Sequence, residues 1–128
     1  MASFNYVGYD EIVKSLGLEM ERIHRNGPAA VAAGAKIAQE AMMSFAPKRT
    51  GGLSKHVKVK GPLYSAARGH YCEVYPDGTN KRGERYATIG FVLEYGRSNM
   101  LPRQWMSSAM AQARPAIEDA IVNELMRD

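Results

Sequence analysis

An alanine-rich run from Pro28 to Phe45 constrains the fold more than any other part of this sequence. Alanine has the highest helix propensity of all residues, so the run predicts a helix. Its small and apolar residues recur at helical spacing, at Ala30, Ala33, Gly34, Ile37, Ala38, Ala41 and Phe45. Because small side chains let another backbone approach closely, we expect this helix to be the most buried one. Pro47 should end it, since proline has no amide N–H to continue the helical hydrogen bonds.

A second amphipathic segment precedes this run. It predicts a helix from Glu11 to His24 with Asp10 as its N-cap. The apolar residues on one face of that helix would be Ile12, Leu16, Met20 and Ile23. The sequence Asn26-Gly27-Pro28 holds a glycine and a proline, which are typical of turns, so we expect two separate helices joined there.

The middle of the chain contains two segments with the sequence features of β-strands. From Leu53 to Lys60 the side chains alternate between two faces with a period of two residues. This pattern predicts a half-exposed strand, which Gly61-Pro62 should end. Tyr71 to Tyr75 predicts a second strand, because it is rich in β-branched and aromatic residues. The stretches at about 60–70 and 76–85 hold many glycine, proline and polar residues, and we expect them to be mobile loops.

Between Phe91 and Trp105 an apolar segment ends at a glycine and is followed by a polar corner. Its apolar residues fit one face of a helix, but a short run such as 87–95 fits a buried strand equally well, and both alternatives stay open. Gly96 stands where a left-handed C-terminal cap is expected, with a positive φ. Trp105 is the largest apolar side chain available, so we expect it to be buried at this corner.

A long amphipathic segment runs from Leu101 to Met126 and predicts a C-terminal helix. Ser98 or Asn99 can cap its N-terminus, and Pro102 suits a first helical turn. Pro115 lies inside the segment, and an interior proline costs about 3 kcal/mol or kinks a helix, so we expect a bend or break just before it.

These patterns predict a single domain over residues 1–128 of the α+β class. Its N-terminal helices and its C-terminal helix should pack on a small, mainly antiparallel β-sheet. A composition of 45% hydrophobic and 23% charged residues is typical of one ordinary globular domain. No apolar run approaches the roughly 20 residues of a membrane span, and the N-terminus lacks a secretory pattern. We therefore expect the protein to stay in the cytoplasm, where it is made. Cys72 is the only cysteine, and we expect a buried or half-buried, unreactive thiol.

Basic residues are concentrated in the middle of the chain. From Lys48 to Arg85 there are nine basic and three acidic residues, an excess of six, while the whole chain carries +4. Three interpretations stay open: a solvated face, a patch for an acidic protein neighbour, or a nucleic-acid contact. The segment lacks the interleaved aromatic and basic residues of single-strand binding platforms.

An enzyme hypothesis finds little support in the motifs. His24, His56 and His70 do not have metal-ligand spacing, and the sequence holds no hydrolase elbow and no phosphate-binding loop. Glu94 is the one carboxylate inside an apolar segment. It is either an acid with a perturbed pKa or, as we expect, a structural group that caps backbone amides or pairs with an arginine. We therefore expect no catalytic residue, no cofactor and no metal.

Two short motifs carry a resemblance to a known family. The first runs from Ala46 to Leu53 and the second from Glu94 to Trp105. In order and spacing they resemble motifs of the tail-completion or head–tail joining (minor tail, neck) proteins of long-tailed bacteriophages and prophages. The residues that carry the resemblance are Ala46, Pro47, Thr50, Gly51, Leu53, Glu94, Tyr95, Gly96, Pro102, Arg103 and Trp105. Members of the family commonly have threonine where Arg97 stands and a second proline where Gln104 stands.

The resemblance implies a structural virion protein at the head–tail junction. Such a protein completes or terminates the tail and joins it to the head through a homo-oligomeric ring, with a hexamer as the expected size. Its partners would be a head-side connector or stopper and the tail tube or terminator, with DNA passing through the ring without sequence-specific contact and no membrane involved. Assembly would take place in the cytoplasm of the host bacterium. The candidate interface residues are Arg97, Arg103, Lys81 and Arg82. The alternative from another class is a small basic nucleic-acid-binding domain.

Overall fold

A computed structural model describes residues 2–47 and 52–127 of the chain, with side chains from residue 20 onward. The elements in these ranges are α1 (Ala2–Phe45), α2 (Gly52–Lys55), β1 (Val57–Ser65), β2 (Gly69–Pro76), α3 (Tyr86–Tyr95) and α4 (Trp105–Leu125). Helices pack on a two-stranded antiparallel sheet, so the α+β class predicted from the sequence is confirmed. No helix in the described part of the chain is long and apolar enough to cross a membrane.

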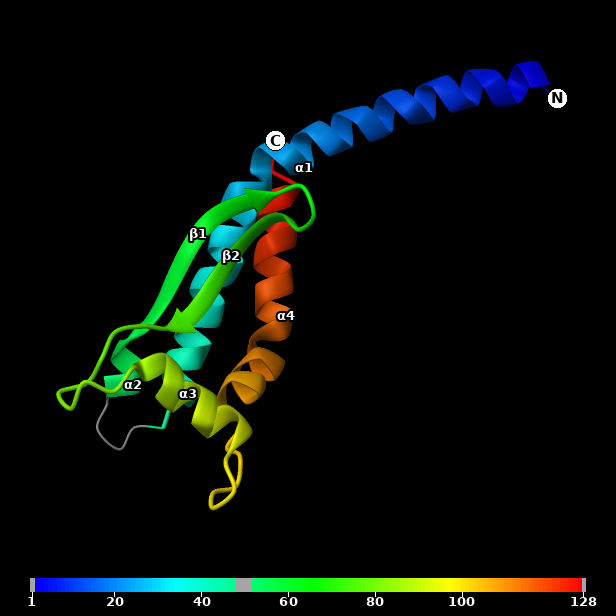
Figure 1. The fold of residues 1–128 in the computed structure, drawn as a ribbon. Coiled ribbons are helices and arrows are strands. Elements are labelled where there is room, and N and C mark those ends of the chain that lie inside the picture. Colours follow the sequence, from blue (N-terminus) through cyan, green and yellow to red (C-terminus); the bar gives the residue numbers. More distant parts are fainter. Residues whose placement is uncertain (1, 48–51, 128) are drawn as a thin grey trace.

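The N-terminal region is one continuous helix, so the prediction of two helices joined at Asn26-Gly27-Pro28 is wrong, and Asp10 lies inside α1 instead of capping it. Tertiary contacts explain why this turn-like sequence stays helical. The buried Asn26 side chain donates hydrogen bonds to the carbonyl oxygens of Leu125 and Arg127, at the end of α4. These contacts hold this part of α1 against α4, although proline removes one backbone donor and α1 bends in this region (Figure 1).

The second half of α1 lies beside α4 (Figure 1). A Cβ on Gly34 would lie 2.9 Å from the Ile121 side chain, so the glycine allows the two helices to approach closely. Ala30 and Ala38 are buried on the same part of α1. The buried small-residue face predicted from the sequence is confirmed at these positions.

α4 begins later than predicted and is not broken. It runs from Trp105 to Leu125 with Pro115 inside it, so of the expected bend or break before this proline, the break is wrong. Pro115 is exposed, and the contact along α1 supports the helix on both sides of it.

The N-terminal half of α1 projects beyond the rest of the structure (Figure 1). α1 has 44 residues. At 1.5 Å per residue this corresponds to about 66 Å, roughly twice the diameter of a small domain. The helix is therefore much longer than the part that packs against α4 and the sheet.

β1 and β2 pair as an antiparallel hairpin from Val57↔Pro76 to Ser65↔Gly69. The register shifts between Lys60 and Leu63, where the Gly61–Pro62 peptide is cis. A two-stranded sheet tolerates proline where the ladder is interrupted. The prediction that Gly61-Pro62 ends the strand is therefore wrong.

Two further boundaries differ from the sequence predictions. Residues 60–70 are mostly strand with a short turn between β1 and β2, so a loop over this whole stretch is wrong. Gly52–Lys55 is a short helix instead of the start of a strand, because Leu53 is buried and the Ser54 hydroxyl donates to the Met43 carbonyl at 2.8 Å. The second predicted strand is confirmed within β2.

The core lies where the C-terminal end of α1 meets α2, α3 and the start of α4. Its buried members are Met42, Ala46, Leu53, Val57, Tyr86, Trp105 and Ala109. The stretch 87–95 lies in α3, so the open choice between helix and strand is settled in favour of the helix.

Candidate assembly surface

The corner between α3 and α4 is closed by short backbone contacts. Gly96 has φ 77° and ψ −175°, and its N–H donates to the Val92 carbonyl at 2.7 Å. The predicted positive φ is confirmed, although ψ is not that of the left-handed helix. Arg97 and Met100 then exchange two backbone hydrogen bonds of 3.0 Å, which fold the chain back on itself.

The Glu94 carboxylate caps the N-terminus of α4. Its Oε1 atom accepts the backbone N–H groups of Met106 at 2.8 Å and Ser107 at 3.2 Å, and Oε2 accepts the Ser107 hydroxyl. Glu94 is 4% exposed. The structural role expected for this carboxylate is confirmed, and negative charge here also suits the positive end of the helix dipole.

The N-cap expected from Ser98 or Asn99 is wrong. Both residues are exposed in the corner loop, and Pro102 lies before α4 instead of in its first turn. Gln104 occupies the N-cap position with φ 48° and makes no capping hydrogen bond with its side chain. Glu94 of the preceding helix supplies the cap instead.

Trp105 anchors the corner in the core. It is 2% exposed, and its Nε1 atom donates to the Gly90 carbonyl of α3 at 3.0 Å. The Arg103 N–H adds a bond to the Leu93 carbonyl at 2.7 Å. The predicted burial of Trp105 is confirmed, and α3 and α4 are joined at their facing ends.

The two resemblance motifs meet in this core. Ala46 and Leu53 from the first motif and Trp105 from the second belong to one buried cluster. Pro47 is half-buried beside it. Thr50 and Gly51 lie outside the described residues.

Apolar side chains cover the outer face of α3 and the loop after it. Phe91 is 61% and Tyr95 64% exposed, with ring centroids 4.7 Å apart, and Leu101 is 85% exposed. The sequence analysis missed this surface. Its signal was the consecutive run Phe91-Val92-Leu93, because adjacent residues of a helix cannot all face one core.

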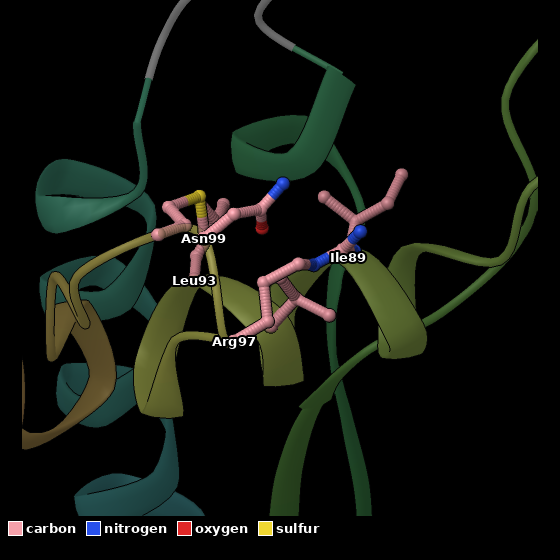
Figure 2. Close-up of a pocket in the computed structure, with 6 residues that line it drawn as sticks. Ile89, Leu93, Arg97 and Asn99 are labelled. Atoms are coloured by element: carbon pink, nitrogen blue, oxygen red, sulfur yellow. The ribbon is translucent and has the colours of Figure 1, made fainter.

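An open groove of about 350 Å³ lies along α3. It is lined by Ile89, Val92, Leu93, Arg97, Asn99 and Met100. Figure 2 shows that the Arg97 side chain runs along α3 toward Ile89, with Asn99 on the loop side. The groove therefore has an apolar floor and a polar, partly cationic rim.

The candidate interface cations are all exposed. Arg97 and Arg103 lie at the corner, and Lys81 and Arg82 lie in the loop before α3. That loop is held by Asn80, whose Oδ1 atom accepts the backbone N–H groups of Arg82 and Glu84, each at 2.9 Å. The structure places the two pairs at different parts of the surface, in the corner and in the loop.

Other polar clusters are small. His70 Nε2 and His24 Nδ1 are 3.2 Å apart, joining β2 to α1, and the His56 ring stacks on Tyr86. Burial raises the pKa of the half-buried Cys72 thiol. Within residues 2–47 and 52–127, no three His, Cys, Asp or Glu side chains form a group that could hold a metal ion.

Comparisons with protein-family models, with curated proteins and with solved structures find no match for this chain.

Proposed function

We propose that this chain is a structural subunit of a long-tailed bacteriophage virion, located at the head–tail junction. It completes or terminates the tail and joins it to the head as a ring of identical copies. The observation that carries the proposal is the exposed apolar pair Phe91 and Tyr95 on α3, together with the exposed Leu101 in the corner loop that follows. Contiguous exposed apolar groups of this kind are typical of protein–protein contact surfaces.

The rigidity of the corner supports this function. Glu94, Gly96 and Trp105 each connect α3 or its end to the segment that follows. A surface held by buried contacts loses little conformational entropy when a partner binds. The resemblance of the same residues to joining-protein motifs supports the choice of partner, namely other phage structural proteins above and below the ring.

The exposed arginines at the corner give the proposal a direct test. We expect the double variant Arg97→Ser/Arg103→Ser to keep the thermal stability of the wild type, because neither arginine side chain is buried. In phage particles that carry it, heads and tails should remain unjoined in electron micrographs. The matched control is Lys58→Ser/Lys60→Ser, which removes two exposed cations from β1 instead.

Two results would contradict the proposal. One is a particle that lacks this protein but has normally joined heads and tails of normal length. The other is failure of an antibody against the chain to label the neck of intact virions.

The exposed Lys58 and Lys60 on one face of β1 favour a second candidate, a small basic nucleic-acid-binding domain. Retention of duplex DNA would then fall steeply with salt concentration, because binding releases counterions from the phosphates. Loss of that retention in Lys58→Ser/Lys60→Ser, with normal retention in Arg97→Ser/Arg103→Ser, would replace the joining function with this one.

A further inference from the structure

We infer that the N-terminal half of α1 is an exchange arm, which each subunit inserts into the α3 groove of a second copy of this chain. "Arm" here means residues 2–23, and "α3 groove" means the open groove lined by Ile89, Val92, Leu93, Arg97, Asn99 and Met100. The inference rests on the proposed ring function, and it names the contact that builds the ring.

Two large apolar side chains at the end of the arm are exposed to solvent. Met20 is 69% and Ile23 45% exposed, although both are large apolar side chains. Together with Ile12 and Leu16 they form an apolar stripe at helical spacing in the sequence. Figure 1 shows the arm extending away from the sheet and from α4. A lone helix in water gains little from such a stripe, so a partner surface is expected to cover it.

The α3 groove has the shape and chemistry that such a helix needs. Its floor is formed by the apolar side chains of Ile89, Val92 and Leu93, and Met100 of the loop adds a fourth apolar group. An amphipathic helix binds a groove through anchors at positions i, i+4 and i+7 or i+8. Ile12, Leu16, Met20 and Ile23 have this spacing.

The charges of the two surfaces are complementary. The arm has four acidic residues, Asp10, Glu11, Glu19 and Glu21, and two basic ones, Lys14 and Arg22. Arg97 lines the groove, Arg85 is the N-cap of the helix that carries it, and Arg103 lies in the corner after that helix; all three are exposed. The single carboxylate between residues 85 and 104 is the buried cap Glu94. Opposite charges speed the association of two surfaces and fix how they align. The acidic arm of a second copy of this chain therefore suits the basic surroundings of the α3 groove.

The arm cannot reach the groove of its own subunit. α3 lies near the C-terminal end of α1, whereas the arm extends from the opposite end (Figure 1). A continuous helix does not fold back over its own length. The contact is therefore between different surfaces of two subunits, and such heterologous contacts generate rings when the rotation closes.

The first test measures self-association of the full-length protein by sedimentation velocity. Ile12→Glu/Leu16→Glu should weaken association by about 10- to 100-fold, because it places two charges on the apolar stripe. The matched control is Lys14→Glu, which makes the same change in net charge on the opposite face of the helix. Equal association of the stripe variant, the control and the wild type would overturn the inference.

A second pair of variants tests the groove side. Val92→Ser/Met100→Ser should weaken association to a similar extent, because both side chains line the groove. Val122→Ser should not weaken it, because Val122 is an exposed apolar residue of α4. Circular dichroism should show that all of these variants are folded, because the replaced side chains are at the surface of the described structure or on the projecting arm.

Mixing the two defective proteins gives the sharpest result. The stripe variant keeps an intact groove, and the groove variant keeps an intact arm. In the mixture, the arm of a groove variant can therefore bind the groove of a stripe variant, and no other arm–groove contact can form. We expect heterodimers and no larger rings. A mixture that stays monomeric would overturn the arm exchange, and so would a wild-type protein that is monomeric at every concentration.

The inference and the proposed function fail in different experiments. If the stripe variant forms normal rings and joins heads to tails, the arm exchange is wrong and the joining function stands. If the arm builds the ring but particles without this protein are normally joined, the arm exchange stands and the virion role is wrong.

Discussion

The Glu94 side chain at the end of α3 accepts the backbone N–H of Met106 in the first turn of α4 at 2.8 Å. Twelve residues separate the two in sequence, and the corner loop lies between them. The same carboxylate also holds Ser107. One buried side chain therefore fixes the angle between the helix that carries the apolar surface and the helix that packs on α1.

Replacing Glu94 tests this cap. Glu94→Ala removes the acceptor for the N-terminal amides of α4 and should lower the free energy of unfolding by about 1–3 kcal/mol. Glu94→Gln keeps an acceptor oxygen in a similar position, so it should lower the free energy of unfolding by less than Glu94→Ala does. Urea denaturation of the two variants measures the difference. Equal losses in both would mean that charge, and not the hydrogen-bond acceptor, matters at this position.

Trp105 tests how the corner is attached to the core. Trp105→Ala should cost about 3–5 kcal/mol, because it leaves a large cavity in the buried cluster. Trp105→Phe keeps much of the packing and loses the hydrogen bond to Gly90, so its cost should be smaller. Phe91→Ala is the matched control on the exposed side of α3 and should change stability by less than about 0.5 kcal/mol. Thermal melts of the three variants would refute this arrangement if their order were reversed.

Several features of the fold could be predicted from the sequence because they depend on one element at a time. The small face of α1 follows from helical spacing, and Ala30 and Ala38 are buried as expected. Gly96 and Trp105 were identified from a glycine after an apolar run and from side-chain size. The α+β class follows from the same local patterns.

Other features depend on contacts between distant residues and could not be predicted locally. The helical state of Gly27-Pro28 depends on Asn26 reaching the end of α4. The failure of Ser98 and Asn99 to cap α4 depends on the path of the corner loop, which leaves both exposed, whereas the capping role of Glu94 was expected. The apolar groove exists because residues 86–95 form a helix. If the same residues formed a buried strand, their side chains would not line an open groove.

Cys72 should be a slow nucleophile in the folded protein. Burial disfavours the thiolate and raises the pKa of the thiol, and the thiolate is the species that reacts. We expect iodoacetamide to modify Cys72 more slowly at pH 8 in buffer than in urea. The raised pKa also makes the free energy of unfolding depend on pH. Because the pKa of Cys72 is higher in the folded state, its contribution to stability is complete below the unfolded-state pKa. It is lost as the pH rises through the folded-state value. Equal rates in buffer and urea would show that the thiol is not protected.

Gly96 and Gly69 separate two causes of glycine dependence. Both have a positive φ, 77° and 74°, so alanine at either position should cost about 1–2 kcal/mol from backbone conformation alone. A Cβ on Gly69 would meet nothing within 4 Å, whereas a Cβ on Gly96 would lie 2.7 Å from the Met100 oxygen and 2.8 Å from the Pro102 nitrogen. These contacts are with backbone atoms, which cannot move without opening the corner.

We therefore expect Gly96→Ala to be clearly more destabilising than Gly69→Ala in chemical denaturation. Gly96→Ala should also impair assembly, because the corner carries Arg97 and borders the α3 groove. Gly69 is the first residue of β2, far from the corner in the chain, so Gly69→Ala should assemble normally at temperatures where it is folded. If the two variants lose equal stability, the close contacts of the corner relax without cost. The angle between α3 and α4 is then set by Glu94 and Trp105 alone.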